Sequence, residues 1–134
     1  MKDQIKIIIV DDNPLFLEGI STFLSKEKDY EIVACFSSGI ELLEYCNNYN
    51  PDLILLDIEM PELNGIQTAK WLNWFRNELK LIAITLYQEN VNLSQLIGAG
   101  FRGFVNKNYV YEKLPHVINS VLKNEFAFPK IQLM

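Results

Sequence analysis

Short apolar runs alternate with longer segments of helical periodicity five times along the chain. The runs are continuous in Ile, Leu and Val instead of alternating with polar residues, which is typical of strands covered on both faces, as in a parallel sheet. Strands are therefore expected at Ile5–Val10, Glu31–Phe36, Leu53–Leu56, Leu81–Thr85 and Gly103–Val105. Strand–helix units of this kind favour an α/β fold, a three-layer sandwich of right-handed βαβ units.

The segments between the strands carry helix-start signals. Asparagine or serine at an N-cap, proline at the first helical position and an acid three residues after a serine cap all favour helix initiation. Such signals are found at Asn13-Pro14, at Ser38 with Glu41 (a capping box), at Asn64-Gly65, around Asn90, and from Asn108 to Val110.

Pro115 falls inside the last helical segment, four residues after Tyr111, whose carbonyl its ring would crowd. Either this helix begins later than Val110 or it bends near its start. The residues that follow, 125–134, lack a clear period, so we assign residues 1–124 to the folded domain. Residues 125–134 are then a C-terminal tail or the start of a linker.

Composition narrows the class of protein. The 134 residues fit one domain, and 49% hydrophobic with 22% charged residues is ordinary for a globular chain. A net charge of −5 without any run of Lys or Arg argues against binding of nucleic acid or of a membrane surface by this domain. No apolar run reaches the roughly 18 residues of a membrane span. We expect a soluble, cytoplasmic domain.

Cys35 and Cys46 lie eleven positions apart, without metal-ligand spacing. Both are expected to be small buried hydrophobic residues in a reducing compartment.

The ends of the predicted strands carry the candidate chemistry. Asp11 and Asp12 follow the first strand, Asp57 the third, Thr85 ends the fourth, and Lys107 follows the fifth. Because ligands of open α/β sheets bind at the carboxyl ends of the strands, these side chains are expected at one edge.

Three carboxylates close together repel one another unless a cation intervenes, and hard oxygen ligands suit Mg²⁺, which also binds phosphate oxygens. With the charge reduced, one carboxylate can act as a nucleophile and become an acyl phosphate. Lys107 and Thr85 are suited to contact phosphoryl oxygens. The residues thus point to Mg²⁺-dependent phosphoryl transfer.

The chain resembles the receiver domain of bacterial two-component response regulators over residues 5 to about 124. The resemblance rests on Asp11-Asp12, on "DIEMPELNG" at 57–65 (D-x-x-M-P-x-x-x-G), on Thr85, and on Phe104-x-x-Lys107. It implies a (βα)5 flavodoxin-like sandwich with a parallel sheet of order 2-1-3-4-5.

The resemblance also implies residue roles at the metal site. Asp57 would be the phosphoacceptor and, with Asp12, would contact Mg²⁺ directly. Asp11 would hold the ion largely through water. The backbone carbonyl of Glu59 would complete the protein ligands.

Thr85 and Phe104 match the coupled switch pair of the family, and Lys107 matches its phosphate-contacting lysine. Phe104 lacks the hydroxyl of the tyrosine that can stand there, so its role is packing into space that Thr85 leaves; the alternative is a plain core aromatic.

Leu86, in place of a small residue, is expected to narrow access to the phosphoryl group. By the same resemblance, Glu59 and Tyr87 stand at positions that tune dephosphorylation; the alternative is that their side chains only face solvent.

In this interpretation a histidine kinase, or a small donor such as acetyl phosphate, phosphorylates Asp57. The face made by the fourth helix, fifth strand and fifth helix then changes, altering contact with an output domain or a homodimer. A homodimer through the first and fifth helices is the other possibility. "DDNPLFLEGI" resembles regulators with helix-turn-helix output, which favours transcription control through a DNA-binding domain outside this chain. The alternative is a stand-alone receiver acting by protein–protein contact.

Two other functions share parts of this pattern. Haloacid-dehalogenase-type phosphohydrolases also use an aspartyl phosphate and Mg²⁺, but their nucleophile follows the first strand. A flavodoxin-like FMN binder would need hydroxyl- and glycine-rich phosphate donors after the first strand, where Asp11 and Asp12 stand.

The third helix is apolar around much of its circumference because Trp71 and Trp74 join its core positions. Partial burial of both is expected, with exposure of one as a contact surface as the alternative. His116, the only histidine, is expected in a surface or helix-packing role.

Overall fold

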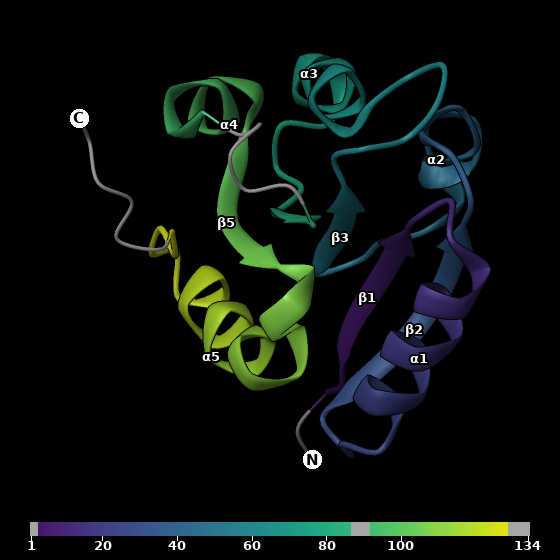
Figure 1. The fold of residues 1–134 in the computed structure, drawn as a ribbon, viewed down its shortest axis with the longest axis vertical. Coiled ribbons are helices and arrows are strands. Elements are labelled where there is room, and N and C mark those ends of the chain that lie inside the picture. Colours follow the sequence, from purple (N-terminus) through teal and green to yellow (C-terminus); the bar gives the residue numbers. More distant parts are fainter. Residues whose placement is uncertain (1–2, 87–91, 129–134) are drawn as a thin grey trace.

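The structure is a computed structural model that describes residues 3–86 and 92–128. Within these residues five parallel strands form one sheet of order β2-β1-β3-β4-β5 (Figure 1). This is the (βα)5 flavodoxin-like arrangement expected from the sequence. The strands are β1 (Ile5–Val10), β2 (Tyr30–Phe36), β3 (Leu53–Asp57), β4 (Leu81–Thr85) and β5 (Phe101–Asn106). The helices are α1 (Pro14–Ser25), α2 (Gly39–Tyr45), α3 (Gly65–Phe75), α4 (Leu93–Ala99) and α5 (Val110–Leu122).

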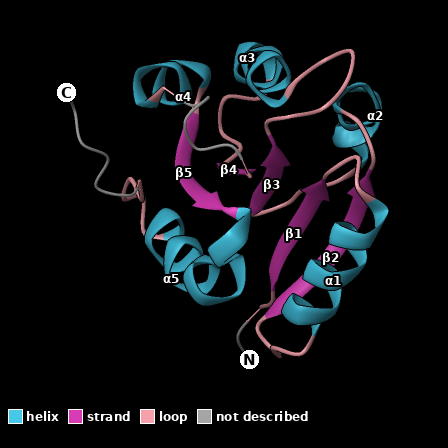
Figure 2. Cartoon of the chain, viewed as in Figure 1, coloured by secondary structure: helices cyan, strands magenta, loops and turns pink. Residues whose placement is uncertain are grey.

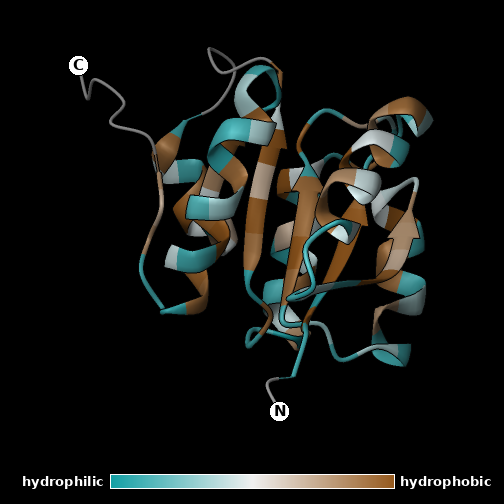
Figure 3. Cartoon of the chain, turned by 90° about the horizontal axis from the view of Figure 1, so that it is seen from below, coloured by the Kyte–Doolittle hydropathy of each residue, from teal (hydrophilic) through white to brown (hydrophobic). Residues whose placement is uncertain are grey.

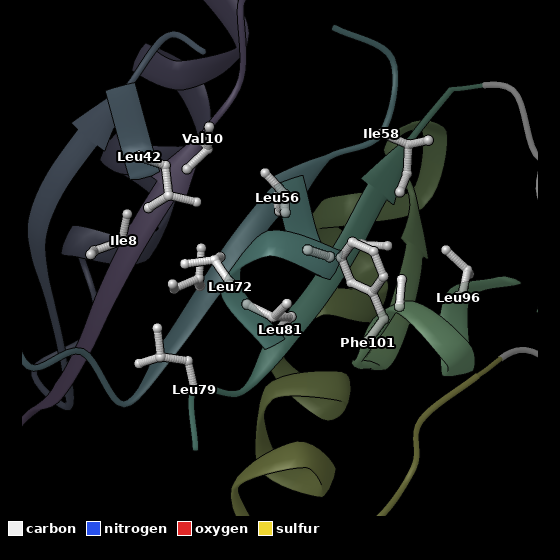
Figure 4. Packing of buried hydrophobic residues seen from close by; sticks show 14 of the residues in the cluster. Ile8, Val10, Leu42, Leu56, Ile58, Leu72, Leu79, Leu81, Leu96 and Phe101 are labelled. Carbon is white, nitrogen blue, oxygen red and sulfur yellow. The ribbon is translucent and has the colours of Figure 1, made fainter. Parts of the chain in front are cut away.

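Two hydrophobic clusters hold the three layers together. One joins the sheet to α2, α3 and α4, and includes Leu42, Leu72 and Leu96 of these helices (Figure 4). The other joins the opposite face to α1 and α5, and includes Ile20 and Leu114. Figure 2 shows the helices on both sides of the sheet, and in Figure 3 the strands are the most hydrophobic part of the chain. The continuous apolar character thus predicted burial on both faces correctly for the central strands β1, β3 and β4, whereas most of β2, at one edge of the sheet, is half-buried or exposed.

Side-chain caps explain where the helices begin. The Asn13 side chain accepts hydrogen bonds from two backbone N–H groups of the first turn of α1. Asn64 and Gln67 form a full capping box at α3. Asn92 caps α4 by accepting from the N–H of Gln95; the predicted start around Asn90 lies outside the described residues.

The capping box expected at α2 is only half formed. Ser38 Oγ accepts the N–H of Glu41, as predicted. The Glu41 carboxylate, however, bonds the N–H and hydroxyl of Ser37 and not the N–H of Ser38. The Glu41 side chain thus accepts from two donors of Ser37, one residue before the N-cap. The hydrogen bonds at the start of α2 therefore extend one residue further than in a standard capping box.

The last helix begins at Val110 although it contains Pro115, so the alternative of a later start was wrong. A short 3-10 helix, Lys107–Tyr109, leads into it. Pro115 lies on the second turn, where the N–H that it lacks would have paired with the carbonyl of Tyr111, on an exposed part of the helix.

Exposure differs from expectation at three residues. Cys46 is buried, but Cys35 is exposed because it lies on β2, at one edge of the sheet. Trp71 and Trp74 are 57% and 85% exposed, so partial burial of both was wrong. The buried face of α3 is made by small and aliphatic residues such as Ala69 and Leu72, and the tryptophans lie outside it.

The C-terminal segment 125–128 returns to the other edge of the sheet. The N–H of Ala127 donates to the Arg102 carbonyl at 2.8 Å, and the N–H of Phe104 donates to the Ala127 carbonyl at 3.1 Å. Ala127 thereby forms a parallel bridge with Gly103, and Phe128 packs against the first core cluster. Part of the edge of β5 is thus covered by the chain itself.

We predict that Ala127→Pro detaches this segment, because proline lacks the N–H that bonds Arg102. The expected loss of unfolding free energy is about 0.5 to 1.5 kcal/mol, measured by urea denaturation. Amide exchange of Phe104 should become faster in the same variant. Ala127→Ser keeps the N–H and should behave as wild type in both measurements; equal effects of the two substitutions would contradict the bridge.

Candidate functional site

The acidic residues predicted to meet do so at the carboxyl edge of the sheet, where β1 and β3 end (Figure 1). Carboxylate oxygens of Asp11, Asp12 and Asp57 lie within 4.8 Å of one another. Asp11 and Asp57 are buried, with 1% and 3% of their surface exposed, whereas Asp12 is exposed. The site therefore has two acids inside the protein and a third at its entrance.

Lys107 enters this group from the end of β5. Its Nζ lies 2.6 Å from Oδ2 of Asp11 and 3.6 Å from Oδ2 of Asp57. The lysine side chain is only 11% exposed, so its positive charge is shared with the two buried carboxylates and little with solvent.

Backbone N–H groups bind the other oxygen of each buried acid. Asp11 Oδ1 accepts the N–H of Asn13 at 2.8 Å, and Asp57 Oδ1 accepts the N–H of Glu59 at 3.3 Å. Both bonds connect an acid to the residue two positions later. They fix the carboxylates to the loops that follow β1 and β3.

The glycine of the D-x-x-M-P-x-x-x-G motif has a packing reason. A Cβ on Gly65 would overlap the carbonyl oxygen of Asp57 and would lie only 2.8 Å from the Cα of Ile58, far inside contact distance. The N–H of Gly65 also donates to the carbonyl of Ile58 at 2.9 Å. The loop can fold back on the end of β3 only because α3 starts with glycine.

The pKa of Asp57 is raised from its ordinary value of 3.8 to about 7. Burial is the main cause, and the negative charge of Asp11 adds to it. The Lys107 ammonium and the N–H of Glu59 lower the pKa in part. A single ammonium is thus insufficient to make this carboxyl behave as an exposed aspartate.

The carboxylates fit Mg²⁺ in number and chemistry. All their ligand atoms are hard oxygens, and the exposed Asp12 leaves the site open for water ligands. Oδ2 of Asp11 is buried and, among the described residues, accepts no hydrogen bond besides its ion pair with Lys107. That oxygen has a lone pair available for a water bound to the ion.

An open cavity of about 420 Å³ leads to Asp57. Asp12, Asn13, Pro14, Glu59, Leu86 and Lys107 line it together with Asp57. Leu86 is 46% exposed at this entrance, where the sequence placed it. Tyr87, the other residue expected there, lies outside the described part of the chain.

Thr85 and Phe104 lie on neighbouring strands. Thr85 is fully buried at the end of β4 and is paired in register with Asn106, while Phe104 is paired with Ala83. The Phe104 ring is 3% exposed and belongs to the first core cluster. The Phe104 ring is therefore already packed inside the protein, and a movement of this ring on phosphorylation would begin from the buried position.

Sequence reasoning missed Phe16, whose ring centroid lies 4.4 Å from Nζ of Lys107. The available signal was its place in the first turn of the helix that follows Asp11 and Asp12. His116, by contrast, lies exposed on α5, in agreement with the surface role expected for it.

The family model described as the response regulator receiver domain matches residues 7–119. The chain belongs to this receiver family. Receiver domains are phosphoacceptor switches, and the acids at the end of the sheet lie within the matched range. The family match argues against the dehalogenase and FMN alternatives, which belong to other families.

Relatives of this receiver domain include regulators of transcription. The chain is 28% identical over 131 residues to the transcriptional regulatory protein DegU of Brevibacillus brevis. The aligned region covers 97% of this chain and 56% of that protein. The chain is also 33% identical over 122 residues to the oxygen regulatory protein NreC of Staphylococcus aureus, covering 90% and 56%. The chain thus spans little more than half the length of these relatives.

Solved receiver structures share the fold. The isolated receiver domain of RcsB from Salmonella enterica serovar Typhimurium, in its apo form, matches with a TM-score of 0.85 at 23% identity, over 95% of this chain and 94% of that one. The receiver domain of the putative response regulator NarL from Mycobacterium tuberculosis matches with a TM-score of 0.84 at 25% identity, over 92% and 100%. Among the described residues, no helix is long and apolar enough to cross a membrane.

We predict that Asp57→Asn stabilises the fold more at pH 8 than at pH 5. The folded-state pKa of about 7 lies above the ordinary value of 3.8 expected in the unfolded chain, so wild-type stability falls as pH rises from about 4 to 7 and then levels off. The amide removes this effect and should raise the free energy of unfolding at pH 8 by about 1 to 3 kcal/mol. Urea denaturation at both pH values measures the difference.

Glu44→Gln, which neutralises an exposed acid on α2, is the matched control and should change stability little at either pH. A gain for Asp57→Asn that is equal at pH 5 and pH 8 would contradict the raised pKa.

Proposed function

We propose that this receiver domain takes a phosphoryl group onto Asp57 from the phosphohistidine of a histidine kinase in a Mg²⁺-dependent reaction. The observation that carries the proposal is the position of Asp57. It is a buried carboxylate at the base of an open cavity, grouped with two more acids and an ammonium. Such a group combines a nucleophile with the charges needed to approach a phosphate.

Asp12 and Asp57 would bind the ion directly, Asp11 through water, and Glu59 through its backbone carbonyl. The bound ion supplies positive charge that offsets the carboxylates and orients the phosphoryl oxygens. The 4.8 Å grouping of the three acids supports this assignment.

In the transfer step, a carboxylate oxygen of Asp57 forms a bond to phosphorus while the phosphorus–nitrogen bond of the donor breaks. Acetyl phosphate would react in the same way, with acetate leaving. The N–H of Glu59 holds one oxygen of Asp57 and so orients the carboxylate. An acyl phosphate is formed without oxidation or reduction.

Lys107 and Thr85 are proposed to bind the phosphoryl oxygens after transfer. Lys107 lies 3.6 Å from Asp57, so a short movement of its flexible side chain is sufficient. Thr85 would donate its hydroxyl, and Phe104 on the next strand would repack in response. The domain would thereby catalyse its own phosphorylation and dephosphorylation only.

The output is proposed to be transcription control in the cytoplasm, through a DNA-binding domain outside these 134 residues. The similarity to transcriptional regulators such as DegU supports this, and a stand-alone receiver acting by protein contact is the alternative. A homodimer through α4, β5 and α5 would have to accommodate segment 125–128 on β5, whereas the α1–α5 face carries no such segment among the described residues.

We predict that the wild-type chain, incubated with acetyl phosphate and Mg²⁺, gains one phosphoryl group by intact-protein mass spectrometry. Asp57→Asn should gain none, since an amide cannot form the acyl phosphate, and omission of Mg²⁺ should strongly reduce labelling of wild type. Asp29→Asn, an exposed acid remote in sequence from the site, is the control and should label fully. Labelling of Asp57→Asn equal to that of wild type would remove the acceptor assignment.

A further inference from the structure

Four residues form a closed circuit of contacts beside the acidic site. Asp11 Oδ1 accepts the N–H of Asn13 at 2.8 Å, and Asn13 Oδ1 accepts the N–H of Phe16 at 3.2 Å. The Phe16 ring faces Nζ of Lys107 at 4.4 Å, and this Nζ pairs with Oδ2 of Asp11 at 2.6 Å. The circuit begins and ends on the same carboxylate.

Within this circuit the lysine lies closer to one acid than to the other. Nζ of Lys107 is 1.0 Å closer to Asp11 than to Asp57, from the distances of 2.6 and 3.6 Å. An ammonium against the face of an aromatic ring is attracted by the negative potential of that face, more strongly where water is excluded. Phe16 is half-buried and Lys107 is 11% exposed, so the contact is largely shielded from water.

We propose that Phe16 is a positioning residue for Lys107, holding its ammonium beside Asp11, and that it thereby weakens the binding of Mg²⁺. The inference rests on the proposed function, because it concerns the same metal site. The ammonium and the divalent cation repel each other, and both are attracted to the same carboxylates. Mg²⁺ therefore binds more easily when Lys107 is free to leave Asp11.

The substitution Phe16→Leu tests this directly. Leucine is apolar and favours the helical conformation, so α1 should be retained, but its side chain has no aromatic face to attract the ammonium. We expect the dissociation constant for Mg²⁺ to fall about two- to fivefold, a change at the lower end of the range for cation–π contacts, because Phe16 itself is only half-buried. The measurement is a titration of the full chain with MgCl₂ at constant ionic strength, followed by backbone amide chemical shifts near Asp57.

Phe23→Leu is the matched control. Phe23 is also a half-buried aromatic residue of α1, but its ring packs edge-on against Tyr111 at 4.8 Å between centroids. This variant loses the same atoms from the same helix and should bind Mg²⁺ as wild type does. A fall of equal size in both variants would show a general effect of loosening α1 and would overturn the proposal.

A double-mutant cycle separates positioning from packing. In a Lys107→Gln background there is no ammonium for the ring to hold, so adding Phe16→Leu should leave Mg²⁺ affinity unchanged. Phe16→Tyr keeps the π face and should restore wild-type affinity in the lysine-containing chain. An effect of Phe16→Leu that persists in the Lys107→Gln background, or a Phe16→Leu affinity equal to that of wild type, would overturn the proposal.

The same titrations distinguish this inference from the proposed function. If the wild-type chain showed no shift changes with MgCl₂, the metal site itself would be refuted, and the inference with it. If wild type binds Mg²⁺ and accepts phosphate on Asp57 while Phe16→Leu titrates as wild type, only the role of Phe16 is refuted.

Discussion

Two buried carboxylates and one ammonium share a small volume at the carboxyl edge of the sheet, and the site depends on the balance among their charges. Asp11 and Asp57 repel each other, and burial removes the water that would screen them. Burial, with the charge of Asp11 added to it, raises the pKa of Asp57 to about 7, and Lys107, which lies closer to Asp11, lowers that pKa only in part. The protein side chains alone therefore supply too little positive charge at the position where a divalent cation and a phosphate would bind.

The fold maintains this unfavourable grouping through its core. β1, β3 and β4 are central strands whose apolar residues are buried on both faces by two clusters of helix and strand side chains. Because the strands run parallel, they all end at the same edge, and each places a polar residue there. Hydrophobic burial along the strands thus offsets the electrostatic cost of the acids at their ends.

The site also connects to both layers of helices. Asp11 is linked to the start of α1 through Asn13, and Asp57 to the loop before α3 through Glu59 and the close approach of Gly65. Thr85 and Phe104 extend the connection to β5, whose outer edge carries segment 125–128. Short chains of contacts thus join the surroundings of Asp57 to the α1 side, the α3 side and the β5 edge.

The sequence by itself determined the order of strands and helices along the chain, the burial of the central strands on both faces, and the gathering of five polar side chains at one edge, those of Asp11, Asp12, Asp57, Thr85 and Lys107. These features follow from local periodicity and from the geometry of parallel strands, which do not depend on particular side-chain contacts. Only the tertiary structure decided that Lys107 pairs more closely with Asp11 than with Asp57, that Phe16 lies against its ammonium, and that Ala127 pairs with β5. It also decided that Cys35, Trp71 and Trp74 are exposed. Each of these depends on the packing of elements distant in sequence or on which strand lies at an edge, and periodicity along the chain carries no information about either.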